Sequence, residues 1–228
     1  MALSVSALAD PAAAPRPWKA DVEFGLVTTR GNTDTENLNA KATVVNEREF
    51  WRHTGRIDAV NNAVDGVRSA ERYFAVVKSD RKLSEVSYVF ASLNYDDDRF
   101  SGYDYRSSLA LGYGRSVIKR EGLELDLEIG AGARRSRLDN SPDAEDEGVL
   151  SGAMRVNWQF SEAAAFGEDL SVEAGEKATI TRSVTSVKST LAANIALKVS
   201  LTVKNTSDVP VPIKNTDTET ATTIVYSF

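Results

Sequence analysis

Residues 123–134 read LELDLEIGAGAR, and their pattern indicates the fold most clearly. Every odd position is apolar, whereas the even positions are Glu, Asp, Gly or Arg. A repeat of two residues places the apolar side chains on one face of a β-strand and the polar ones on the other. The stretch therefore predicts a strand that separates an apolar medium from a polar one.

The same alternation recurs in about a dozen segments from Trp18 to the end of the chain. Clear examples lie at residues 18–26, 103–114, 150–160 and 197–204. The predicted connectors are short and long in turn: the short ones lie at residues 46–49, 79–82, 119–122 and 161–163, and the long polar ones at residues 61–70, 96–102, 138–148, 175–182 and 205–217. Short periplasmic turns and longer outer loops are typical of membrane β-barrels.

We therefore predict an all-β fold, an antiparallel up-and-down transmembrane β-barrel of twelve strands with the N- and C-termini in the periplasm. Residues 18–228 form this barrel as one domain. The sequence does not show clearly which face of residues 88–96 points outward. Tyr88 and Phe90 are apolar at even positions, and the odd positions of the same segment are apolar too. We expect the odd set to face outward, because the even positions 92, 94 and 96 are Ser, Asn and Asp.

Composition excludes several classes of protein. The net charge of -6 leaves no basic tract for nucleic acid, so none is expected as a partner. The chain has no cysteine, which excludes disulfides and thiolate metal sites. Mean hydropathy is -0.29, and no run approaches the roughly 18 apolar residues that a spanning helix needs. A membrane barrel passes this test, because it needs apolar residues only at alternate positions.

The first residues predict export. Residues 1–9, MALSVSALA, end in an A-x-A pattern and are interpreted as a signal-peptide remnant. Residues 10–17, DPAAAPRP, form a Pro/Ala-rich linker. An ordinary N-terminal tail is the alternative.

Aromatic residues favour a membrane barrel over a soluble, lipocalin-like barrel that turns its apolar face inward. Amphipathic rings prefer the level of the lipid headgroups, so a membrane barrel carries them at both rims. The predicted girdle consists of Trp18, Trp51, Trp158 and Tyr226 at the periplasmic rim, and of Tyr73, Tyr103 and Tyr105 at the outer rim.

The polar face predicts a lumen filled with charges. Its main members are Arg106, Glu124, Asp126, Glu128, Arg155, Lys198 and Lys204. The three carboxylates share one face of one strand, about 7 Å apart, a spacing that also suits an acid pair or a cation site. We interpret them as a ladder balanced by Arg106 and Arg155 on neighbouring strands. No cofactor or metal is expected.

The C-terminus carries a resemblance to known proteins. Ile224, Tyr226 and Phe228 resemble the terminal signal by which the barrel-insertion machinery takes up outer-membrane proteins. The wider chain resembles the family of salt-induced outer-membrane proteins, a family of unknown function. The matching pieces are Trp18 with Gly25, residues 31–35 (GNTDT), 98–100 (DRF) with Gly102, 105–106 (YR), 111–114 (LGYG) and 216–218 (TDT). The resemblance implies a β-barrel in the bacterial outer membrane, and it supplies no catalytic residues.

These features predict a non-enzymatic barrel, either a narrow ion or small-solute channel or a structural protein induced by stress. Its expected partners are outer-membrane lipid and lipopolysaccharide, with the insertion machinery and periplasmic chaperones during biogenesis. One alternative is a membrane-embedded hydrolase of lipid or peptide that uses His53, the only histidine. Such a site needs a hydroxyl nucleophile and a third, orienting group. The other alternative is a scaffold that binds an envelope protein through its loops.

Overall fold

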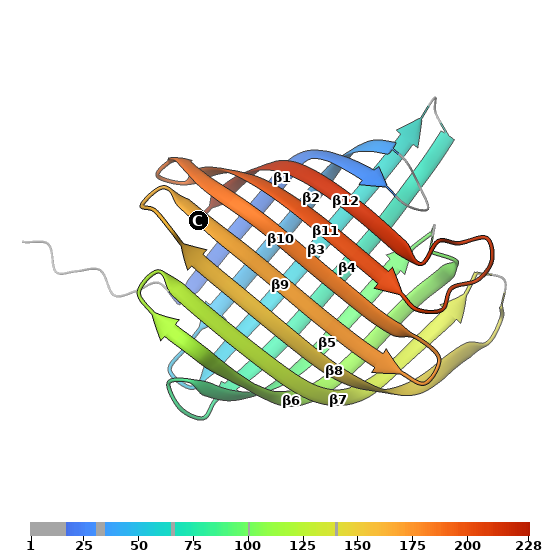
Figure 1. Cartoon of the computed structure of the whole chain (residues 1–228), viewed down its shortest axis with the longest axis horizontal. Coiled ribbons are helices and arrows are strands. Elements are labelled where there is room, and N and C mark those ends of the chain that lie inside the picture. Colours follow the sequence, from blue (N-terminus) through green and yellow to red (C-terminus); the bar gives the residue numbers. More distant parts are fainter. Residues whose placement is uncertain (1–16, 31–34, 65–66, 100, 140) are drawn as a thin grey trace, which may run out of the picture.

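The computed structural model describes residues 17–30, 35–64, 67–99, 101–139 and 141–228. It contains twelve strands joined in sequence order (Figure 1). They are β1 (Trp18–Arg30), β2 (Thr35–Glu47), β3 (Trp51–Val64), β4 (Val67–Lys82), β5 (Ser87–Asp98), β6 (Tyr103–Arg120), β7 (Leu123–Leu138), β8 (Ala144–Gln159), β9 (Ala164–Gly175), β10 (Thr179–Ala192), β11 (Ile195–Thr206) and β12 (Thr216–Ser227). No helix in these ranges is long and apolar enough to cross a membrane.

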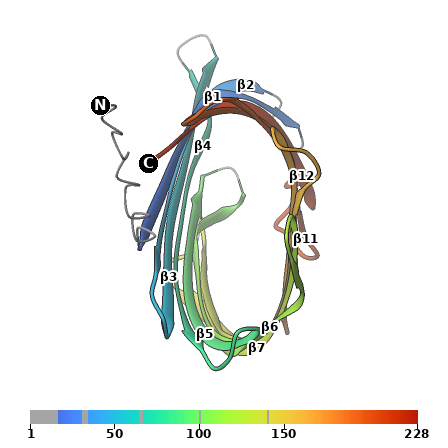
Figure 2. The same cartoon turned by 90° about the vertical axis from the view of Figure 1, so that its left-hand side faces the viewer.

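Each strand pairs antiparallel with its sequence neighbours, and β1 pairs with β12 to close the barrel. The closing register sets Val22 opposite Tyr226 and Phe24 opposite Ile224. Seen end on, the barrel has an elongated oval section, so its two long walls face each other (Figure 2). The predicted fold class, a closed antiparallel barrel of twelve strands, is confirmed.

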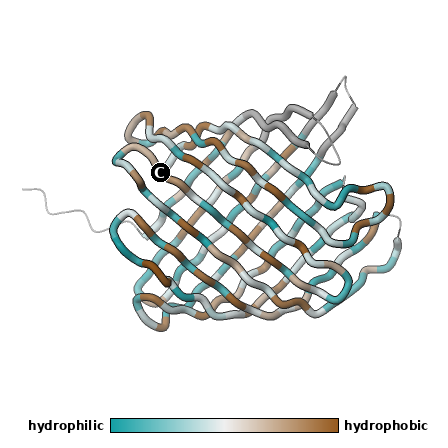
Figure 3. The backbone as a smooth tube through the Cα atoms, viewed as in Figure 1, coloured by the Kyte–Doolittle hydropathy of each residue, from teal (hydrophilic) through white to brown (hydrophobic). Residues whose placement is uncertain are grey.

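The barrel is apolar outside and polar inside, the reverse of a soluble protein. Outward residues such as Ile129 (69% exposed) alternate with inward ones such as Arg134 (2% exposed). Along the strands, apolar and polar positions follow each other in turn (Figure 3). In β5, Val89 and Leu93 are exposed, so the odd positions face outward as expected. A wall of this kind suits a lipid surround with a polar lumen.

The outer connectors are all shorter than predicted, most clearly at three places, one of which is the 138–148 connector, reduced to residues 139–143. Strands β3 and β4 run to Val64 and from Val67, through most of the predicted 61–70 loop. Only residues 176–178 separate β9 from β10. The prediction failed because the strands continue beyond the apolar belt. In the sequence of these segments apolar and polar residues no longer alternate regularly, while the backbone pairing continues.

The segments predicted at the N-terminus fall outside the description. The signal-peptide remnant, residues 1–9, and the linker up to residue 16 are not among the described residues. The same holds for residues 31–34 of the first predicted turn.

Candidate functional site in the barrel lumen

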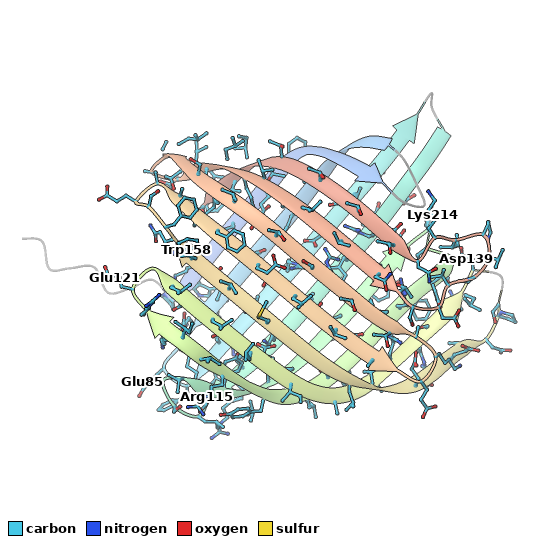
Figure 4. All side chains as sticks on the ribbon, viewed as in Figure 1. Glu85, Arg115, Glu121, Asp139, Trp158 and Lys214 are labelled. Atoms are coloured by element: carbon cyan, nitrogen blue, oxygen red, sulfur yellow. The ribbon has the colours of Figure 1, made fainter. Side chains whose placement is uncertain are left out.

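The inner half of the lumen is an open vestibule of about 720 Å³. It lies at the end of the barrel where Glu121 and Trp158 are found (Figure 4). Glu124, Lys188 and Lys198 are among its charged lining residues. Lys198 Nζ donates to Glu23 Oε1 at 3.1 Å, from β11 to β1.

A central cavity of about 260 Å³ follows, and aromatic rings narrow it. Tyr88 and Phe90 of β5 are buried in the lumen. Their rings lie over Gly112 and Gly114 of β6, where a methyl group on Gly112 would come within 2.6 Å of Phe90 Cζ. Glycine is therefore required at these positions so that the rings can lie flat against the wall. Tyr88 Oη donates to Glu128 Oε1 at 2.7 Å.

The outer half is crossed by ion pairs between walls that are far apart in the barrel. Lys204 of β11 bonds Asp96 of β5 at 2.6 Å, although the two strands are six places apart in the barrel order. Arg72 of β4 bonds Glu219 of β12 at 3.0 Å. The flattened section brings these walls within reach of long side chains (Figure 2). The pairs obstruct the space that a barrel of twelve strands would otherwise leave open.

Arg134 of β7 is the most enclosed cation of this half. Its Nη2 lies 2.9 Å from Glu147 Oε1, and its Nη1 lies 3.7 Å from Glu173 Oε2. The guanidinium also donates to the Ala178 carbonyl at 2.5 Å. It therefore joins β7, β8, β9 and the β9–β10 turn, and a buried charge of this kind is tolerated because it is paired.

The β11–β12 connector, residues 207–215, covers part of the outer opening. Gly102, in the β5–β6 turn, has φ = 77°, a left-handed conformation that favours glycine. A methyl group there would meet Pro210 Cγ at 3.3 Å and Ile213 Cγ1 at 3.2 Å. Because β12 and β6 lie on opposite walls, the connector reaches across the mouth.

The predicted lumen residues all lie on the inner face, but their partners differ from those expected. Arg155 Nε donates to Asp169 at 2.8 Å rather than to Asp126, which is opposite it in register. Asp126 accepts from Ser116 Oγ at 2.6 Å, and Glu128 is paired with Lys78. The three carboxylates share the inner face as predicted, but within the described residues none of them forms an ion pair with Arg106 or Arg155.

Arg106 and Glu124 have other surroundings than those predicted. The Arg106 guanidinium lies 4.5 Å from the ring centroid of Tyr103, and Glu124 is exposed in the vestibule. Arg155 and Asp126 each pair with their other neighbouring strand, and the alternation cannot choose between the two neighbours. Only Glu128 pairs with a strand that is not adjacent, through Lys78 of β4. Inward facing gives no information about reach across the lumen. In the described part of the chain, no group of His, Asp or Glu could hold a metal ion.

Tyr103 departs from its predicted place in the outer girdle. An irregularity in the β5–β6 and β6–β7 pairings near Asp104 shifts the register by one residue. As a result Tyr103 joins Arg106 at the mouth of the lumen, and Asp104 pairs with the exposed Arg137. Tyr105 keeps its outward position and stacks with Tyr95 at 6.2 Å.

Tyr73 is exposed and lies opposite Asp97 near the outer end of β5, although β4 begins six residues before it. The aromatics predicted for the periplasmic rim lie together at one end of the barrel. Trp18, Trp51, Trp158 and Tyr226 are exposed at strand ends on the vestibule side. Ile224, Tyr226 and Phe228 share the outer face, and the Phe228 N–H donates to the Ala20 carbonyl at 2.9 Å.

His53 lies on the outer wall of β3, within this rim. Its ring stacks on Trp51 with centroids 5.7 Å apart, and its Nδ1 is 3.0 Å from Ser79 Oγ of β4. Ser79 could not be singled out from sequence, because only the β3–β4 register sets it opposite His53. Asn46 is opposite His53 in the β2–β3 register, but its amide donates to the Pro17 carbonyl at 3.2 Å, and no carboxylate or amide of the described residues hydrogen-bonds the other ring nitrogen.

The apolar outer wall, the aromatic rim and the charged lumen are the features of the class of transmembrane β-barrels. The chain belongs to the family described as protein of unknown function DUF481, whose model matches residues 22–228. It is 29% identical over 222 residues to the uncharacterized protein YdiY of Escherichia coli (strain K12), covering 96% of this chain and 86% of that protein.

Solved structures share the fold. The NanC porin has a TM-score of 0.61 at 11% identity, with 91% of this chain and 98% of that chain covered. The KdgM porin has a TM-score of 0.51 at 12% identity, with 91% and 99% covered. The translocator domain of the autotransporter NalP from Neisseria meningitidis has a TM-score of 0.52 at 9% identity, with 95% and 90% covered. At these identities the likeness shows the fold alone.

Proposed function

We propose that this protein is a small, non-enzymatic channel of the bacterial outer membrane, with a path that is open to the periplasm and constricted in its outer half. The observation that best supports this proposal is the set of ion pairs that cross the outer lumen, above all Lys204 with Asp96 and Arg72 with Glu219. Charged side chains that span the lumen leave room for ions or small solutes, whereas a general porin needs an open bore.

The proposal includes the setting of the protein. Phe228 and the residues at alternate positions before it serve as the insertion signal for the barrel-insertion machinery and its chaperones. The tryptophan rim anchors the wall in lipid, and lipopolysaccharide surrounds the outer end. Induction by salt or osmotic stress is inferred from the resemblance to salt-induced outer-membrane proteins. A constricted lumen would limit the passage of solutes through the barrel under such conditions.

Conductance in planar bilayers tests the channel. Purified protein is expected to give small or no current steps, because the outer lumen is crossed by paired side chains. A large, stable pore in the unmodified protein would refute the constriction and indicate a general porin.

Cell fractionation tests the placement. The protein is expected in the outer-membrane fraction, and its gel mobility is expected to change on boiling, because closed barrels resist detergent until they are heated. Recovery from the periplasm without detergent would contradict the membrane placement.

The hydrolase alternative rests on the 3.0 Å contact between Ser79 Oγ and His53 Nδ1. A nucleophilic serine needs a base that is itself oriented by a third group, and the described residues supply no such group. We therefore assign His53 to the aromatic rim with Trp51. Lipid or peptide hydrolysis that disappears in both His53→Ala and Ser79→Ala would overturn this assignment.

A further inference from the structure

Two arginines in the lumen share a single carboxylate. Arg56 of β3 has its Nη2 3.4 Å from Asp58 Oδ2, and Arg182 of β10 has its Nη2 3.9 Å from the same oxygen. Within the described residues neither guanidinium makes a hydrogen bond, and the Nε atom of each is buried without a partner. The two guanidinium groups therefore share one carboxylate as their ion-pair partner.

Phe74 of β4 holds both guanidinium groups in place. The Cζ atoms of Arg56 and Arg182 each lie 5.0 Å from the centroid of its ring. Guanidinium groups stack on aromatic rings through their flat faces, which leaves the N–H groups at their edges to bind other partners. The two arginines come from opposite walls, and both guanidinium groups lie against the same apolar ring. Their N–H groups are therefore held close together as hydrogen-bond donors before a ligand binds.

The surroundings leave this pair with excess positive charge. Seven Lys or Arg side chains and five Asp or Glu side chains line the central cavity. Lys204 and Arg155 each bond a carboxylate of that cavity at 2.6 and 2.8 Å. Asp58 is not among the lining residues. Arg106, another lining cation, is directly opposite Asp96 in the β5–β6 pairing. Arg56 and Arg182 therefore differ from the other lining cations in that the carboxylate they share, Asp58, lies outside the lining.

We propose that Arg56 and Arg182 bind a small carboxylate anion in the central cavity. A planar carboxylate matches the fork of a guanidinium and can accept two hydrogen bonds from it. The cavity volume of about 260 Å³ is below that of sites for drug-sized ligands, so the ligand is an anion of a few heavy atoms. The inference rests on the proposed function only in needing a lumen that solutes can enter, since equilibrium binding requires no current.

The experiment titrates the purified barrel in detergent with trifluoroacetate and follows the fluorine NMR signal. Arg56→Gln and Arg182→Gln are each expected to raise the dissociation constant about tenfold or more, because each removes a charge-assisted donor. The matched control is Arg155→Gln, which removes the same charge from the same cavity but from an arginine bonded to Asp169. It is expected to change the constant by less than about twofold.

Asp58→Asn should change the dissociation constant in the opposite direction. It therefore tests the site even if an arginine variant does not fold. Removal of the competing carboxylate is expected to tighten binding of trifluoroacetate. Equal weakening in Arg155→Gln would show a diffuse positive field and overturn the site. Stronger binding of inorganic phosphate than of trifluoroacetate would overturn the choice of a carboxylate. Absence of binding to a folded barrel of small conductance would overturn the anion site and leave the proposed function standing.

Discussion

Lys198 and Lys204 lie on the same strand and the same face, yet their surroundings differ. Lys198, in the inner half, bonds Glu23 on β1, two places away in the barrel order, beside an open vestibule of about 720 Å³. Lys204, in the outer half, bonds Asp96 on the opposite wall. Position along the strand therefore decides whether a lumen lysine lines a path or blocks it.

Two arginines of the lumen also differ in how far they are buried. Arg134 in the outer half is 2% exposed, whereas Arg155 in the inner part of the lumen keeps 43% of its side chain exposed. Ion pairs that are buried become costly when one partner is removed, because the other charge is left without compensation. Exposed pairs contribute little because water and salt screen them. Removal of Arg134 should therefore cost more than removal of Arg155, although the inner half also holds a buried carboxylate, Asp80, which is 2% exposed beside Arg52.

The largest effect is expected from Arg134→Gln. The substitution leaves Glu147 and Glu173 facing each other without their shared cation, and it should lower the free energy of unfolding by about 3–5 kcal/mol. Urea titration of the barrel folded into lipid vesicles measures this change. A loss below 1 kcal/mol, the level of an exposed pair, would show that the outer half is no more enclosed than the inner half.

The second-largest effect concerns which face of the barrel wall is in contact with lipid. Leu201→Arg places a charge on the lipid-facing side of β11 and should cost about 2–4 kcal/mol. Ser200→Arg, one residue earlier, points into the lumen and should cost much less. Folding efficiency into vesicles of matched thickness compares the two variants. Equal costs would contradict the facing of β11.

The smallest effect is expected from Arg155→Gln. This arginine pairs with Asp169 where both side chains are about half exposed, so its removal should change the free energy of unfolding by about 0.2–1 kcal/mol. The same urea titration at low and high salt reports the change, which should shrink further as salt rises. A loss as large as that of Arg134→Gln would erase the difference between the halves.

The sequence was sufficient to predict the strands and their facing. In residues 123–134 and in most other segments, each change of polarity marks a change of side, because neighbouring residues of a strand point to opposite faces. Twelve strands and the inward position of Arg106, Lys198 and Lys204 followed from this rule.

Partners across the lumen could not be predicted in this way. Asp96 and Lys204 are separated by 108 residues, and they meet only because the barrel is flattened. The alternation fixes the side on which a residue lies but not the distance to the opposite wall. The predicted position of Tyr103 in the outer girdle was wrong for a related reason. The strand pairing shifts by one residue near Asp104, and the alternation of polar and apolar residues does not reveal this shift.

The central claim is that cross-lumen pairs close the outer half, and single-channel conductance of Lys204→Ala beside Lys198→Ala tests it most directly. Both variants remove one lysine from the inner face of β11, so they differ only in depth. We predict that Lys204→Ala raises the conductance above that of the unmodified protein, because the bond to Asp96 is lost, while Lys198→Ala leaves it nearly unchanged. A larger rise in Lys198→Ala, or no rise in Lys204→Ala, would contradict the account.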